Sequence, residues 1–188
     1  MLTWEELENA CLSCEKCPIS KNRTNVVVGD GNKNAKLVFV GEAPGEEEDK
    51  QGKPFVGRAG KFLDLALTSL ELSREKDFYI CNILKCRPPN NRVPTEVEAQ
   101  NCLPFLRAQI KLISPKIIVC LGATAMKYIL GKDLKITQDR GKWFEKGNFL
   151  IMATYHPAAL LRDPGKREDF YRDLKSVKER LEKIATKP

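Results

Sequence analysis

The sequence predicts an α/β protein, a three-layer α/β/α sandwich around a mostly parallel sheet of four strands. Four short apolar segments, residues 36–40, 77–82, 116–122 and 147–154, have the length and composition of buried strands. Segments with a helical spacing of apolar residues separate them or follow them. Strands that alternate with helices form parallel sheets with right-handed crossovers, so this order indicates a layered α/β/α domain.

Length and composition favour one domain. At 188 residues, with 42% hydrophobic and 30% charged residues, the chain can bury a sizeable core, and it carries no repeat or long linker. We therefore expect a single domain over residues 1–188. No apolar run is long enough to span a membrane, and the N-terminus is acidic where a signal peptide would be basic. We expect an intracellular protein, and its net charge of +7 permits a polyanionic partner.

The N-terminal segment combines a helix signal with closely spaced cysteines. Thr3 and Glu6 form a capping-box pattern that predicts a helix ending near Cys11. Cys11, Cys14 and Cys17 follow with CxxCxxC spacing, and in a reducing compartment this spacing indicates a metal site. Thiolates suit either zinc or an iron–sulfur cluster, and the spacing leaves both open.

The first core strand ends in an abrupt turn at Gly41, followed by an acidic stretch to residue 49 and by Phe55, which we expect to be exposed in a loop. Residues 58–72 have helical spacing. The second strand ends near Asn82, and a proline-stiffened basic loop occupies residues 85–94. A second capping box starts at Thr95 and opens a helix in which Pro104 predicts a kink or a restart.

Polar side chains follow three of the predicted strands. Glu42 follows the first, Asn82 ends the second, and His156, the single histidine, follows the last. Because the carboxyl ends of parallel strands share one edge of a sheet, we expect these side chains to converge on one cleft. Each also has a purely structural interpretation: Asn82 as a turn cap, His156 as a buried imidazole, and Phe55 as a core residue. Helices over residues 123–130 and 167–184 complete the layers.

Five separate matches in the same order make the chain resemble the family 4 (iron–sulfur) uracil-DNA glycosylases over nearly its whole length. The matching segments are residues 14–18, 40–49, 54–60, 82–89 and 155–162. The resemblance implies an enzyme that flips uracil out of DNA and hydrolyses its N-glycosidic bond, leaving an abasic site. It also implies a structural 4Fe–4S cluster held by Cys14, Cys17, Cys86 and Cys102. Cys11, Cys81 and Cys120 would then be spare.

The resemblance implies a role for each residue at the strand ends. Phe55 would stack on uracil, and the Asn82 amide would recognise its N3–H and O4. His156 and backbone N–H groups of residues 41–45, from Gly41 onward, would stabilise charge on O2. Related glycosylases position the attacking water with an Asp where this chain has Ala43, so we expect Glu42 to orient water or to support the loop. Glu48 would reject the methyl group of thymine, whereas Glu46 and Asp49 would be solvated or helix-start acids.

Two basic loops are the expected contacts to DNA. The first would press on the backbone, and the second would place exposed leucines as an apolar wedge in the duplex. Burial of either leucine in the core is the alternative. The residues are Arg87, Pro88, Arg92, Leu160, Leu161 and Arg162. We expect a monomer acting on single- and double-stranded uracil-containing DNA, cytoplasmic and associated with the nucleoid. A replication-clamp partner is left open.

Three other functional classes each account for only part of the sequence. An electron-transfer or redox-sensing protein would explain four cysteines and leave Phe55, Asn82 and His156 without a purpose. A non-catalytic nucleic-acid-binding module would explain the charge and leave a base-sized pocket unexplained. A homologue that traps its product covalently would need an additional histidine near the first motif, and residues 50–53 contain none.

Overall fold

The computed structural model describes residues 2–186 and contains one six-stranded sheet in the order β1-β3-β2-β4-β6-β5. Its four central strands are mutually parallel, as predicted: β3 (Phe78–Asn82), β2 (Leu37–Gly41), β4 (Ile117–Leu121) and β6 (Phe149–Thr154). The expectation of four strands is wrong in number. Short strands β1 (Asp30–Gly31) and β5 (Trp143–Lys146) pair antiparallel at the two edges.

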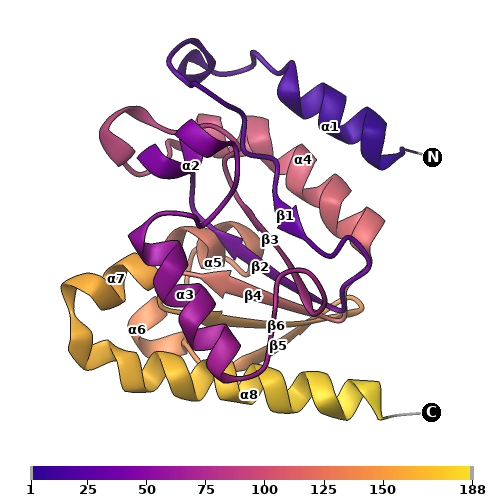
Figure 1. Ribbon diagram of the computed structural model, residues 1–188, viewed down its shortest axis with the longest axis vertical. Helices are drawn as coiled ribbons and strands as arrows, with labels where there is room; N and C mark the ends of the chain where they lie inside the picture. Colours follow the sequence, from indigo (N-terminus) through magenta and orange to yellow (C-terminus); the bar gives the residue numbers. More distant parts are fainter. Residues whose placement is uncertain (1, 187–188) are drawn as a thin grey trace.

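Helices cover both faces of the sheet (Figure 1), which gives the predicted three layers. Alternate residues of β2 point to opposite faces, as the strand period requires. Leu37 and Phe39 pack with helices α3 (Arg58–Ser69) and α8 (Arg167–Ala185), and Val38 and Val40 pack with α4 (Glu96–Ile113) and α5 (Ala123–Ile129). All four side chains are fully buried. Burying a side chain of this size stabilises the fold by roughly 1.5–3 kcal/mol, so the continuous apolar strands hold the layers together.

The predicted helices are present and differ from the predictions mainly by a few residues at their ends, whereas three short helices, over residues 46–51, 136–139 and 157–162, were not among the predicted ones. Their bounds are α1 (Trp4–Leu12), α2 (Glu46–Gln51), α3 (Arg58–Ser69), α4 (Glu96–Ile113), α5 (Ala123–Ile129), α6 (Ile136–Asp139), α7 (Pro157–Arg162) and α8 (Arg167–Ala185). Short 3-10 turns span Pro18–Lys21, Pro89–Asn91 and Pro164–Lys166.

Both capping boxes are confirmed. The Thr3 hydroxyl accepts a hydrogen bond from the backbone N–H of Glu6, and the Thr95 hydroxyl accepts one from that of Glu98. In each box the glutamate carboxylate in turn accepts from the backbone N–H of the threonine. Pro104 lies inside α4, which runs on as one helix, so the predicted restart is wrong. Packing of the buried face of α4 on the sheet outweighs the one backbone hydrogen bond that proline removes. Among residues 2–186, no helix is both long and apolar enough to cross a membrane.

Candidate active site

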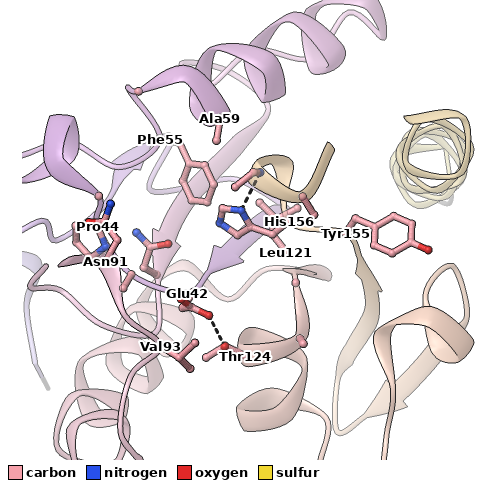
Figure 2. A pocket seen from close by; sticks show the side chains of 18 of the residues that line it. Glu42, Pro44, Phe55, Ala59, Asn91, Val93, Leu121, Thr124, Tyr155 and His156 are labelled. Atoms are coloured by element: carbon pink, nitrogen blue, oxygen red, sulfur yellow. Dashed lines mark hydrogen bonds between the residues drawn. The ribbon is translucent and has the colours of Figure 1, made fainter. Parts of the chain in front are cut away.

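A pocket of about 830 Å³ opens at the carboxyl ends of the central strands, where the alternation of strands and helices predicts a site. Its lining includes Glu42, Phe55, Asn82 and His156, which the sequence analysis expected to converge. These side chains come from segments that are far apart in the sequence, and Figure 2 shows Glu42, Phe55 and His156 among the residues around the pocket. The volume lies in the range of small-molecule sites and is ample for one extruded nucleotide.

Gly41, the last residue of β2, lies beneath the pocket. A side chain at this position would collide with the Phe55 ring and would place its Cβ 2.5 Å from Oδ1 of Asn82. The aromatic ring and the amide therefore approach the same point of the backbone, and only glycine leaves room for both.

Asn82 ends β3 and is 2% exposed. Among the described residues, its Oδ1 is the one buried side-chain polar atom without a hydrogen-bond partner. Leaving a buried acceptor unsatisfied costs about 1–3 kcal/mol. Such an atom in a pocket wall indicates a partner supplied by a ligand, and it disfavours the interpretation of Asn82 as a turn cap.

Phe55 is held in an unusual backbone conformation. Its φ is 53°, in the left-handed region that costs a non-glycine residue about 1–3 kcal/mol. Arg74 fixes this conformation because its guanidinium donates to the carbonyl oxygens of Pro54 and Phe55, at 2.7 and 2.5 Å. The expectation of an exposed ring is wrong: Phe55 is 5% exposed, and it both joins the core and lines the pocket.

Glu48 supports the same loop from the other side. Its Oε1 accepts from the backbone N–H groups of Val56 and Gly57, at 3.1 and 3.0 Å. The carboxylate lines the pocket, and these two bonds give it the structural task of holding the segment that carries Phe55.

His156 caps the short helix α7, with Nδ1 accepting from the backbone N–H of Ala158 at 3.1 Å. Burial, with a smaller contribution from the positive charge of Arg162, lowers the pKa of His156 to about 4. The imidazole is therefore neutral near pH 7. Because Nδ1 accepts a hydrogen bond, the proton sits on Nε2, and that N–H is a donor available to the pocket.

Glu42 also lines the pocket, and its Oε2 accepts a short hydrogen bond from the hydroxyl of Thr124 (Figure 2). The side chain of Ala43 adds an apolar contact to the same wall. Thr124 and Arg74 were not identified from the sequence. The rule that selected the other strand ends could have indicated Thr124, because it lies three residues after the end of β4, in the first turn of α5. Arg74 acts through backbone carbonyls and leaves no sequence signal.

The chain is similar to known proteins over most of its length. A family model, the uracil DNA glycosylase superfamily, matches residues 28–181. A type-4 uracil-DNA glycosylase of Thermotoga maritima is 51% identical over 171 residues, which cover 87% of this chain and 88% of that protein. A type-4 uracil-DNA glycosylase of Archaeoglobus fulgidus is 45% identical over 187 residues, covering 95% and 94%. The chain belongs to the type-4 uracil-DNA glycosylases. The resemblance inferred from the motifs is thereby confirmed.

In this uracil-DNA glycosylase the first basic loop is more constrained than expected. Arg92 makes a bidentate ion pair with Glu98, with N–O distances of 2.9 and 2.6 Å, and Nε of Arg87 donates to Asn91 at 2.7 Å. Pro88 is buried and lines the pocket. The ion pair lowers the pKa of Glu98 to about 2, so Arg92 keeps its anionic partner throughout the physiological pH range.

The second basic loop of the glycosylase is helix α7, and its two leucines differ. Leu160 is fully buried in the core with α3 and α8, so its expected exposure is wrong. Leu161 is partly exposed, and Arg162 is exposed and lines the pocket. Adjacent residues on a helix face different directions, so Leu160 packs into the core and Leu161 does not.

A second cavity of this glycosylase is lined by the four cysteines Cys14, Cys17, Cys86 and Cys102. Three of their sulfurs accept N–H donors: Cys17 from Asn101 at 3.7 Å, Cys86 from Arg23 at 3.5 Å, and Cys102 from the backbone of Lys85 at 3.3 Å. Within residues 2–186, no three cysteine, histidine or acidic side chains form a group that could hold a single ion. The four thiols line one cavity, and N–H donors directed at sulfur stabilise the deprotonated thiolate form.

The other cysteines and Asp49 have structural surroundings. Cys11, Cys81 and Cys120 are 1%, 1% and 0% exposed. Burial raises the pKa of Cys11 to about 12. Of the two alternatives for Asp49, a solvated charge is wrong, because it is 6% exposed and its Oδ1 accepts from the backbone N–H of Thr24 at 2.9 Å. The alternative of a helix-start acid is confirmed, because Asp49 and Glu46 both lie in the first turn of α2.

Proposed function

We propose that this protein removes uracil from DNA by hydrolysing the N-glycosidic bond and leaving an abasic site. One observation carries the proposal: the unpartnered, buried Oδ1 of Asn82 lies beside the Phe55 ring, above Gly41. Family membership gives the same activity. A base that is stacked inside a duplex cannot enter this pocket, so the nucleotide would be flipped out of the helix first.

Uracil complements the pocket walls. Stacking on Phe55 would contribute about 1–3 kcal/mol. The N3–H of uracil would donate to Oδ1 of Asn82, and the amide N–H₂ would donate to O4. Cytosine has an acceptor at N3 and a donor at C4, so it would leave the buried oxygen without a partner. Sites that strand a buried polar group reject the wrong substrate strongly.

The bond to be broken joins C1′ of the sugar to N1 of uracil. As it breaks, its electron pair moves to the base, and negative charge develops at N1 and O2. The Nε2–H of neutral His156 would donate to O2, and backbone N–H groups of residues 41–45 would add to this stabilisation. Loss of one donor of this kind costs about 2.7–4 kcal/mol of transition-state stabilisation.

Water completes the hydrolysis. Its oxygen would bond to C1′ as the sugar becomes cation-like, and Glu42 would orient it and accept its proton. The bond from Thr124 to the Glu42 carboxylate supports this assignment, because it fixes where the second oxygen points. Ala43 contributes only apolar contact. Glu48 would act mainly by holding the Phe55 segment, and we also keep its proposed role against the thymine methyl group.

DNA would lie across the pocket mouth. Leu161 would fill the space of the extruded base, and Arg162 would contact phosphate. Arg87, Pro88 and Arg92 would contact the backbone on the other side, with Arg92 held by Glu98. We propose that the chain acts as a monomeric single domain on both single- and double-stranded DNA.

The cysteine cavity fits a 4Fe–4S cluster. Four thiolates from Cys14, Cys17, Cys86 and Cys102 are the donor set that such clusters take, and the N–H donors at three sulfurs favour anionic ligands. When bound, the cluster would tie the N-terminal segment to the loop after β3 and to α4. Its role would be structural, since its cavity and the uracil pocket share no lining residue.

The decisive experiment is incubation with an oligonucleotide that contains one uracil, followed by alkali. We expect a break at the uracil and none where cytosine or thymine replaces it. Asn82→Ala should lower excision at least about 100-fold and leave duplex binding intact. Asn148→Ala, an exposed asparagine in the β5–β6 turn, is the matched control. Excision by Asn82→Ala at the parental rate would contradict the assignment.

A further inference from the structure

Lys85 connects the uracil pocket to the cysteine cavity through protein atoms. It is 1% exposed, and its Nζ donates to the backbone carbonyl of Asn82 at 2.7 Å and to Oε1 of Gln109 at 2.7 Å. Its own backbone N–H donates to Sγ of Cys102 at 3.3 Å. One residue therefore touches both the strand end that carries the proposed uracil-recognition amide and a proposed cluster ligand.

The surroundings of this ammonium are neutral. Among the described residues, no carboxylate lies within ion-pair distance of Nζ, and both hydrogen-bond acceptors are uncharged amide oxygens. A buried charge without a partner of opposite sign is costly, on the order of several kcal/mol even after relaxation. The ammonium therefore needs a negative charge from another source.

The cysteine cavity supplies that source. Lys85 lines it together with the four cysteines, and the other cations in its wall are Lys16 and Arg23, of which Arg23 donates to Sγ of Cys86. Four deprotonated thiolates carry more negative charge than the metal group they enclose neutralises, so a loaded site is anionic. Three cationic side chains in the wall of one small cavity match an anionic occupant.

The remaining contacts of Lys85 keep its side chain in place. Gln109 is fully buried, accepts from Nζ through Oε1, and donates through Nε2 to the Val28 carbonyl at 2.8 Å and to the Tyr79 hydroxyl at 3.2 Å. Every hydrogen-bonding group of the amide is thus directed, and the ammonium cannot turn away from Asn82 without breaking this network.

We propose that Lys85 is a positioning residue that uses the negative charge of the thiolate-bound group to hold the backbone of Asn82, and so couples occupancy of the cysteine cavity to uracil recognition. This proposal rests on the proposed function, since it assigns Asn82 to uracil. It gives the cysteine cavity an effect on recognition in addition to a structural one.

The test uses holoprotein and two readouts that do not depend on turnover. One is the midpoint potential of the bound cluster by film voltammetry, and the other is the dissociation constant of free uracil base by calorimetry. In Lys85→Met, loss of a nearby positive charge should make the potential more negative, and loss of the bond to Asn82 should raise the dissociation constant by roughly 10- to 100-fold. Lys146→Met is the matched control, because this exposed lysine also donates to a backbone carbonyl, that of Ile129, at 2.7 Å.

A second variant separates charge from hydrogen bonding. Gln109→Glu keeps Lys85 and an oxygen acceptor for its ammonium, and it places a carboxylate there at the loss of the donations from Nε2 to Val28 and Tyr79. We expect a more negative potential with little change in uracil affinity. This variant also decides the charge argument if Lys85→Met does not fold, because an unchanged potential in Gln109→Glu would then overturn the proposal.

The outcomes distinguish this proposal from the proposed function. If Lys85→Met matches Lys146→Met in both potential and uracil affinity, Lys85 has no positioning role, whatever the native protein excises. If the native protein leaves uracil-containing DNA intact and does not bind uracil, the proposed function fails and the coupling to recognition fails with it. A protein that excises uracil while its Lys85→Met variant is unchanged contradicts only the coupling.

Discussion

The phenyl ring of Phe55 and the imidazole of His156 lie 5.5 Å apart, centroid to centroid, with 30° between their planes (Figure 2). One ring offers an apolar face for stacking, and the other offers an N–H donor. Their separate chain positions are brought together by Gly41 and Gly122, whose lack of a side chain leaves room for Phe55 and His156 respectively. The proposed catalytic and stacking functions therefore share one wall of the pocket.

Replacing Arg74 with Met should disturb this arrangement without touching the pocket. The variant loses two hydrogen bonds to the carbonyls of Pro54 and Phe55, which hold the ring in its left-handed conformation. We expect KM for uracil-containing DNA to rise about 10-fold, with a smaller change in kcat. Steady-state kinetics measure both. Arg172→Met, which removes an exposed arginine, should leave both constants unchanged. A fall in kcat alone would contradict the positioning role.

His156 should make stability depend on pH in a defined window. Its pKa of about 4 in the folded protein lies below the ordinary value of 6.5, so the unfolded chain takes up the proton first as pH falls. The free energy of unfolding should therefore decrease from pH 6.5 to 4, by at most about 3 kcal/mol, and this contribution should be constant below pH 4.

Urea denaturation at several pH values measures this dependence. His156→Asn is the suitable comparison, since asparagine is a good helix cap and does not titrate. The difference between the native protein and this variant should shrink as pH falls through the window. A difference that does not change with pH would show that the imidazole has no perturbed pKa.

The adjacent leucines of α7 should separate stability from DNA binding. Leu160→Ala removes a fully buried side chain and should lower the free energy of unfolding by about 2–5 kcal/mol. Leu161→Ala should have little effect on stability and should weaken excision more from duplex than from single-stranded DNA, where no stack needs filling. Denaturation and excision assays on the two substrates provide the test, and equal losses on both substrates would reject the wedge.

The cysteine assignments predict metal content. Purified protein should be brown and contain iron in place of zinc, and Cys17→Ser should lower its iron content sharply. Cys11→Ala should retain the iron, because Cys11 lies in the apolar cluster with Leu7 and Phe105. Elemental analysis and the visible absorption spectrum measure both variants. A colourless native protein loaded with zinc would contradict the assignment of an iron–sulfur cluster.

The central strands were predictable because burial on both faces makes them continuous apolar runs, as in residues 37–41 and 117–121. Strand β5 was missed because its burial is only partial and its sequence, from Trp143 to Lys146, mixes aromatic and charged residues. Edge strands gain their pairing from a neighbour, and local sequence does not show this.

The candidate site was predictable where residues follow strand ends, and less so where tertiary contacts decide. Phe55 was identified, but its burial follows from Arg74, which lies outside its motif, and from the close packing of its backbone on Gly60. Leu160 and Leu161 are indistinguishable by residue type, and only the packing of α7 on the core separates them. Lys85 was included in a basic loop, whereas in the structure it is among the most buried side chains.

The uninterrupted course of α4 through Pro104 has a mechanical consequence. In the first turn of the helix, Glu98 forms an ion pair with Arg92. One turn later Cys102 lines the cysteine cavity, and farther along Gln109 accepts a hydrogen bond from Lys85. One continuous helix thus sets the spacing between the basic loop at Arg92, the cysteine cavity and the backbone of Asn82. We therefore expect a displacement of this helix to alter all three places together.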